Sequence, residues 1–251
     1  MNRILITLIS SLLLSTATAS AQSPAFIDHG KAEKFIDIDA HLLFGGSYVS
    51  NNYNKCYSEI SDLNSTMGFA YGAGVGVKFN FTNFIGLGTQ FNYTFNKGKM
   101  DMAVTREGAP NVSNVFLRNS YRNVDIPIYM SFTFNLAPRI RWEANGGMYL
   151  GFGSGGSQKT TIYNAKVNEL GQLLTTVQHL KAGYYNDDKA FINSYKRNDM
   201  GLYIGTGLIF YDRISINAAA HIGLSNVAKS SGIVKPSAHN FKVFGSVGYH
   251  F

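Results

Sequence analysis

The clearest pattern in the chain lies between residues 67 and 95. Over residues 67–81 nearly every second residue is large and apolar, and the residues between them are mostly glycine or alanine. Alternation with a period of two is typical of a β-strand with one apolar face. The alternation resumes at Ile85, directly after Thr82-Asn83-Phe84, and continues to Phe95. The stretch therefore predicts a β-hairpin of two long strands joined by a short turn.

The two faces of this hairpin differ in side-chain size as well as in polarity. One face carries Met, Phe, Tyr and Val, whereas the other is nearly all small and has almost no charge apart from Lys78. A soluble β-sandwich would place charged residues on its outer face. An almost uncharged face of small residues suits the crowded interior of a narrow barrel whose large residues face lipid.

Six further segments alternate in the same way, which brings the predicted number of strands to eight. They cover residues 36–44, 124–135, 140–152, 200–210, 214–224 and 241–251. The connections between strands alternate long and short along the chain, as in outer-membrane barrels with short periplasmic turns and long outer loops. The predicted fold class is all-β: an eight-stranded antiparallel up-and-down transmembrane β-barrel formed by residues 35–251.

Two local features modify this prediction. Pro127 lies inside the segment 124–135 and cannot donate a ladder hydrogen bond, so it predicts a β-bulge there. The long connection 153–198 is expected to be irregular, and a connection of that length is either functional or disordered. Within it, a helix-like spacing of apolar residues predicts a segment that docks on a partner; these residues are Leu173, Leu174, Val177 and Leu180.

Composition narrows the class of protein further. Only 15% of the residues are charged, 14% are aromatic, and there are 26 glycines. Ordinary soluble domains carry about 25% charged residues. A soluble lipocalin-like barrel is the rival interpretation, but it would turn the large residues of all eight strands inward, and their volume exceeds what such a lumen holds.

The N-terminal region has the features of a secretory signal. Arg3 supplies the positive end, residues 4–14 form an apolar run, and Ala19-Ser20-Ala21 provides the small residues of a cleavage site. We expect residues 1–21 to be this signal and residues 22–34 to be a periplasmic lead-in. Cys56 is the only cysteine; it is either an incidental loop residue or a thiol for an intermolecular bridge, because one thiol forms no intrachain disulfide.

Five charged residues fall on the small-residue faces near the periplasmic ends of their strands. They are Asp37, Asp39, Lys78, Arg141 and Glu143. Buried charges must be paired and hydrogen-bonded, so these residues predict a structural ion-pair network inside the barrel. Lys78 is expected to pair with Asp37 or Asp39.

Two constellations could in principle carry catalysis. Asp37-x-Asp39-x-His41 places two carboxylates and an imidazole on one strand face, which is a weak metal or protease signal. His221 and Ser225 form the other constellation, although no acid stands near them in the sequence. The first constellation falls in the periplasmic half, away from the outer rim, and His221 of the second is expected on the lumen face, so we predict no catalytic residues, no metal and no cofactor.

Three motifs carry a resemblance to a known family. They are the final strand with Val247, Tyr249 and Phe251 at a spacing of two, the run Asp125-Ile126-Pro127-Ile128-Tyr129, and the run Gly146-Gly147-Met148-Tyr149-Leu150-Gly151. Over residues 35–251 the chain resembles the PorT-like outer-membrane barrels of Bacteroidetes-type bacteria, which have an OmpA-like eight-stranded architecture. The final strand resembles the C-terminal signal that the barrel assembly machinery reads. One named member of the family is associated with assembly of the type IX secretion pathway.

These observations predict a monomeric, non-enzymatic barrel in the outer membrane. We expect it to act as a scaffold or accessory factor that engages another envelope protein, with type IX secretion assembly as the pathway implied by the resemblance. The formal charge is +7, and most of the positive excess falls in the long outer connections, where it could meet lipopolysaccharide phosphates among the outer-membrane lipids. No nucleic-acid-binding motif accompanies it. A barrel enzyme acting on lipid or peptide and a small ligand-binding or pore-forming barrel remain as alternatives.

Overall fold

The structure, a computed structural model, describes residues 25–105, 111–168, 170–185, 194–229 and 235–251. Antiparallel strands make up most of it. None of the described helices is long and apolar enough to cross a membrane. The elements in chain order are β1 (Ile36–Asn51), α2 (Tyr53–Cys56), β2 (Ile60–Asn80), β3 (Ile85–Thr105), β4 (Asn111–Ala137), β5 (Ile140–Val167), β6 (Leu173–Gly183), β7 (Asn198–Phe210), β8 (Ile214–Gly223) and β9 (Ala238–His250).

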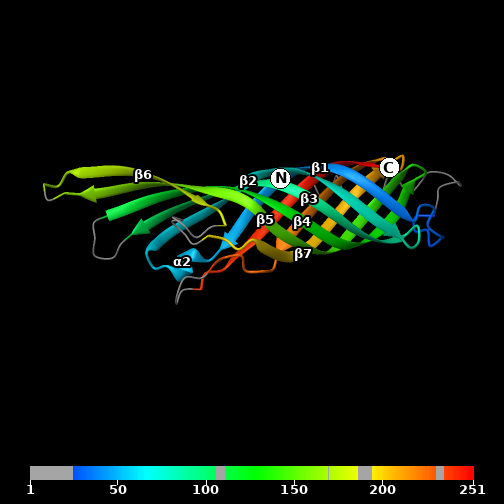
Figure 1. Cartoon of the computed structure of the whole chain (residues 1–251), viewed down its shortest axis with the longest axis horizontal. Helices are drawn as coiled ribbons and strands as arrows, with labels where there is room; N and C mark the ends of the chain where they lie inside the picture. Colours follow the sequence, from blue (N-terminus) through cyan, green and yellow to red (C-terminus); the bar gives the residue numbers. More distant parts are fainter. Residues whose placement is uncertain (1–24, 106–110, 169, 186–193, 230–234) are drawn as a thin grey trace, which may run out of the picture.

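Eight of the nine strands close into a ring. The sheet order is β4-β3-β2-β1-β9-β8-β7-β5-β6, and an additional pairing between β4 and β5 closes the barrel. The ninth strand, β6, pairs with the distal half of β5 and lies at the far end of the molecule, away from the closed ring (Figure 1). The predicted all-β fold and the eight-stranded up-and-down barrel are therefore confirmed, with one extra strand outside the ring.

The opening hairpin has the faces that its alternation predicts. Lys78 and Ala70 are buried inside the barrel, whereas Phe69 is 57% exposed and faces outward. Tyr71 of β2 and Phe95 of β3 lie opposite each other and stack with ring centroids 5.2 Å apart. Large residues on the outside would be costly in water but are favourable against lipid, so this distribution marks a membrane-spanning surface.

Aromatic residues gather at the end of the barrel with the short turns. Phe84 contacts both Phe132 and Phe134, and Phe134 stacks on Trp142 at 4.8 Å. The lead-in docks here too, because the backbone carbonyl of Phe26 accepts from Asn135 at 2.9 Å. This aromatic girdle and the short turns mark the periplasmic interface. The predicted signal over residues 1–21 lies outside the described residues.

Beyond the other end of the ring, β2, β3, β4 and β5 run on as one sheet that also includes β6 (Figure 1). The prediction that residues 153–198 are irregular is wrong, because β5 continues to Val167 and β6 follows. The helix-like interpretation of residues 173–180 is likewise wrong. The inner face of this extension packs a cluster that includes Met100, Leu117 and Tyr53 of α2. Outside the bilayer, the burial of these apolar side chains against one another therefore stabilises the extended strands.

Pro127 does not produce the predicted bulge. Residues on both sides of it keep one register with β3, although Pro127 itself is absent from that ladder, and on the other side it lies opposite Tyr149 of β5. A missing N–H removes a hydrogen bond without forcing an extra residue into the strand. The β4–β5 ladder instead shifts register at two other places, between Arg122 and Asn123, which face Gly155 and Gly153, and between Asn135 and Ala137 near the turn.

Candidate functional site

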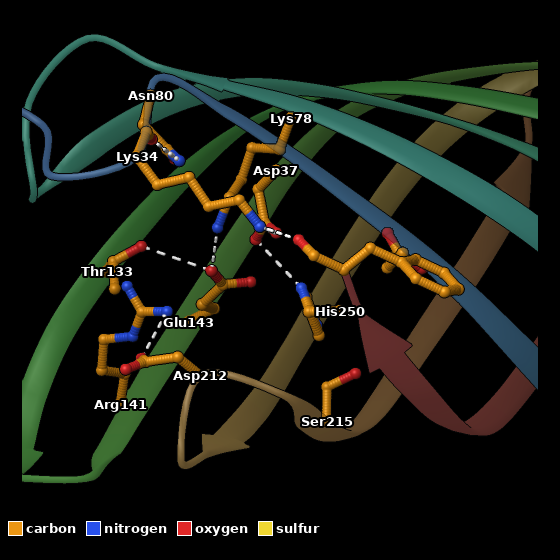
Figure 2. Close-up of polar contacts among 12 residues, drawn as sticks. Lys34, Asp37, Lys78, Asn80, Thr133, Arg141, Glu143, Asp212, Ser215 and His250 are labelled. Atoms are coloured by element: carbon orange, nitrogen blue, oxygen red, sulfur yellow. Dashed lines mark hydrogen bonds and ion pairs between the residues drawn. The ribbon is translucent and has the colours of Figure 1, made fainter.

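The periplasmic end of the lumen holds a cluster of paired charges (Figure 2). Lys78 of β2 donates to Glu143 of β5, and Thr133 also contacts that carboxylate, at 3.4 Å. Asp37 of β1 instead lies 2.9 Å from His250 of β9 and 3.3 Å from Lys34. The expected pairing of Lys78 with Asp37 or Asp39 is therefore not observed, since Glu143 takes that place.

The other two predicted residues, Arg141 and Asp39, pair with different partners. Arg141 pairs with Asp212 at 2.8 Å, on the exposed turn between β7 and β8. Asp39 lies 2.5 Å from His41 Nδ1, and His41 Nε2 lies 2.7 Å from Asn92 Oδ1. With a carboxylate and an amide oxygen as acceptors, both ring nitrogens of His41 are occupied. This arrangement holds the ring in place and leaves no nitrogen free for a substrate.

The most deeply buried ion pair was missed by sequence reasoning. Lys242 Nζ of β9 lies 2.8 Å from both oxygens of Asp125 on β4, and both side chains are 0% exposed. Thr94 also contacts Asp125, at 3.3 Å. Both charges stand on the small-residue faces of their strands, the same signal that identified Lys78. The pairing itself arises only when the barrel closes, because β4 and β9 are not neighbours in the sheet.

A second buried carboxylate, Asp199, is held by neutral donors. Tyr149 and Ser225 donate to it at 2.8 Å, and Asn240 donates at 2.9 Å. His221 stacks on Tyr149 with ring centroids 4.8 Å apart. Ser225 is thus engaged with Asp199, and His221 with an aromatic ring. Among the described residues, no group of three or more His, Cys, Asp or Glu side chains could hold a metal ion.

Tyrosines fill the lumen toward its outer end. Tyr184 stacks on Tyr121 at 4.4 Å and on Tyr195 at 4.6 Å, and it meets Tyr185 edge-on at 4.9 Å. Below this tyrosine layer lies a cavity of about 40 Å³, bordered by Tyr129, Tyr203 and His221 among others. A volume of that size holds one or a few waters and no larger solute.

A wider vestibule of about 230 Å³ opens at the periplasmic rim. Charged side chains line much of it, including Glu33, Lys34, Asp37, Arg141 and Asp212. Its charges belong largely to the ion pairs described above. In the same half of the barrel, the predicted assembly-signal residues Val247, Tyr249 and Phe251 are exposed on the lipid face.

In the sheet outside the ring, strand β6 is exposed over most of its length. Of the eleven residues of β6, nine are exposed, and the apolar ones are Leu173, Leu174, Val177 and Leu180. By contrast, the inner face near α2 is well packed: burial raises the pKa of Tyr53 to about 12. The extended sheet is therefore packed on its inner face near α2 but leaves the outer edge of β6 uncovered.

Fold and surface together define a transmembrane β-barrel of the outer membrane. Residues 21–229 match the family of outer membrane protein beta-barrel domains, and the chain belongs to that family. Its location is therefore the outer membrane. No curated protein sequence matches the chain.

Solved structures to which the chain is similar are outer-membrane proteins of low sequence identity. Ail of Yersinia pestis, solved with the heparin analogue sucrose octasulfate, is 12% identical with a TM-score of 0.35; the match covers 87% of this chain and 100% of Ail. Neisserial surface protein A is 10% identical with a TM-score of 0.32, covering 87% and 98%. An outer membrane channel from Pseudomonas putida F1 is 10% identical with a TM-score of 0.31, covering 93% and 100%.

Proposed function

We propose that the protein is a non-enzymatic outer-membrane scaffold whose strand β6 pairs with an extended segment of another envelope protein. The observation that carries the proposal is the open edge of β6. One side of this strand bonds β5, and no described strand bonds the other. On that open side every second residue of the eleven-residue strand presents an unpaired N–H and C=O, and such a row is a ready template for an added strand.

The composition of β6 supports this role. Proteins usually protect an exposed edge with charges, proline, a bulge or a very short strand. β6 contains no proline, and Lys181 is its one Lys, Arg, Asp or Glu. Its exposed apolar side chains would remain in water unless a partner covered them. Pairing with an incoming strand satisfies the backbone groups and covers the side chains at once.

The filled lumen supports a function on the outside of the barrel. Ion pairs and tyrosines occupy its length, and the cavity between them has room only for water. A barrel enzyme would need a reachable acid–histidine pair that is free to act. Asp39 and His41 are enclosed with Asn92, and Asp37 at the vestibule is engaged by both His250 and Lys34. A pore would need the tyrosine layer to move aside. Both alternatives are therefore less favoured than a scaffold.

The partner we propose is a component of the cell envelope that presents an extended segment at the cell surface. Type IX secretion assembly is the particular pathway that the resemblance to PorT-like barrels suggests. In this proposal the barrel itself is monomeric, and the assembly machinery inserts it by reading Val247, Tyr249 and Phe251.

Photo-crosslinking in intact cells tests the proposal. A photo-crosslinking amino acid in place of Gln178 is expected to capture one defined envelope protein, and the additional substitution Val177→Lys is expected to reduce that capture. The matched control carries the crosslinker in place of Asn54, which is exposed on α2 at the same side of the membrane. Equal capture from both positions, capture of a second copy alone, or no capture from Gln178 would each refute the proposal.

A further inference from the structure

Four basic residues form one row across the outward face of the extended sheet. The register places Lys99 of β3 opposite Arg118 of β4, Arg118 opposite Lys159 of β5, and Lys159 opposite Lys181 of β6. All four side chains are exposed. Neighbouring strands are about 4.8 Å apart, so the row spans about 14 Å. We call these four residues the basic row.

The basic row lies beyond the outer end of the lipid-facing belt. On β3 the outward apolar residues run from Ile85 to Phe95, which is the length of strand that crosses a bilayer core. The next outward residue is Lys97, followed by Lys99 of the basic row. Arg122 of β4 lies opposite Phe95, at the upper limit of the belt. On β5 the last outward apolar residue of the belt, Phe152, precedes Lys159 by seven residues, so the row is nearest to the belt at Lys99 and farther from it at Lys159.

The charges of the basic row are poorly compensated within the protein. Like charges directly opposite each other destabilise a sheet, and the row contains three such contacts. In the described part of the chain, the one acid paired with it is Asp101, which lies 2.6 Å from Arg118. A multivalent anion bound across the row would relieve this repulsion. Lysine and arginine are also the side chains that commonly bind phosphate.

We propose that the basic row binds the phosphate groups of lipid A, the anionic glycolipid anchor of lipopolysaccharide in the outer leaflet. Lys97 and Arg122 lie on the same outward face, between the row and the apolar belt, and would contact the same headgroup. The acyl chains would then lie along the belt below. The row reaches β6 at Lys181 but lies on the outward face of the sheet, whereas the proposed partner pairs with the open backbone edge of that strand, so the inference does not depend on the partner.

Native mass spectrometry of the purified full-length barrel, titrated with lipid A in detergent micelles, measures this binding. The quadruple variant Lys99→Gln, Arg118→Gln, Lys159→Gln and Lys181→Gln is expected to bind lipid A about tenfold more weakly or worse, because each basic group near an anionic lipid surface contributes appreciably. Lipid A without phosphates is expected to bind equally weakly to the native protein and to the variant.

A matched variant controls for net charge. It replaces four other exposed lysines on the same side of the membrane with glutamine: Lys55, Lys166, Lys196 and Lys235. It is expected to retain native affinity. A third variant, Lys99→Arg, Lys159→Arg and Lys181→Arg, keeps the charge and should also retain binding. Heat-modifiable migration of each variant in detergent gels verifies that the barrel is folded.

Several results would overturn the inference. These are an equal loss of affinity in the two glutamine variants, undiminished binding of phosphate-free lipid A to the native protein, and unchanged affinity in the basic-row variant. Competition experiments decide whether the ligand of the basic row is a lipid or a soluble anion. If inorganic phosphate or a sulfated polysaccharide occupies the row while lipid A does not, the ligand is a soluble anion and not a lipid.

Discussion

The buried ion pair between Lys242 and Asp125 allows a quantitative prediction. In Lys242→Met the ammonium group is lost while a chain of similar volume remains, so packing alone should cost less than about 1.5 kcal/mol. Asp125 loses the two contacts at 2.8 Å, and among the described side chains it keeps the hydrogen bond from Thr94 at 3.3 Å. Removing one partner of a buried pair typically costs about 3–5 kcal/mol.

We therefore expect Lys242→Met to lower the free energy of unfolding by about 3–5 kcal/mol, a large fraction of the roughly 5–15 kcal/mol typical of folded proteins. The double variant Lys242→Met with Asp125→Asn removes both charges and should recover at least about 1 kcal/mol of this loss, since contacting residues couple by about 0.5–3 kcal/mol. Lys166→Met, at an exposed position, should stay within about 0.5 kcal/mol of the native protein.

Equilibrium unfolding in urea, with the barrel in detergent micelles, gives these values. Trp142 is the only tryptophan and lies on the barrel wall, so its fluorescence reports on barrel folding. A loss below about 1 kcal/mol in Lys242→Met would contradict the reasoning from buried charge. So would a double variant that is no more stable than the single one.

Three further predictions follow from other parts of the molecule. Gly88→Ala should lower stability by about 1–3 kcal/mol in the same unfolding assay, because the new methyl group would lie 2.5 Å from the ring of Tyr129; Gly146→Ala, with no atom within 4 Å, should be nearly neutral. Asp101→Asn should strengthen lipid A binding in the titration, because it removes the acid paired with the basic row; weaker binding would contradict the electrostatic argument. Burial raises the pKa of Tyr53 to about 12, so its folded state stays protonated while the unfolded state ionises near pH 10. The resulting stabilisation, about 2–3 kcal/mol, is present below pH 10 and lost as the pH rises to about 12; Tyr53→Phe should make unfolding less dependent on pH over that range, and an unchanged slope would refute the assignment.

The membrane-spanning part of the fold could be predicted from sequence because a bilayer imposes two opposite environments on each strand. Phe69 must face lipid and Lys78 must not, so alternation alone assigns both. Outside the membrane that constraint weakens. In β6 both faces are exposed to water, and the adjacent pair Leu173 and Leu174 breaks the alternation. The strand therefore gave a helix-like pattern and was predicted wrongly.

The ion pairs show a different limit. Alternation and strand direction fix which charges enter the lumen and at what height. They do not fix which charges meet, because that depends on how the barrel closes. Lys78 of β2 could reach carboxylates on several strands at its level. In the closed barrel it forms its ion pair with Glu143 of β5. The pair between Asp125 and Lys242 joins β4 to β9 and has the same origin.

The central claim is that the lumen is closed and that the protein acts through its outer surface. Conductance of the purified barrel in planar lipid bilayers tests that claim most directly. Because buried ion pairs and the layer formed by Tyr121, Tyr184, Tyr185 and Tyr195 occupy the interior, we predict no stable open channel. A stable, reproducible conductance step from the native protein would contradict the account and favour a pore.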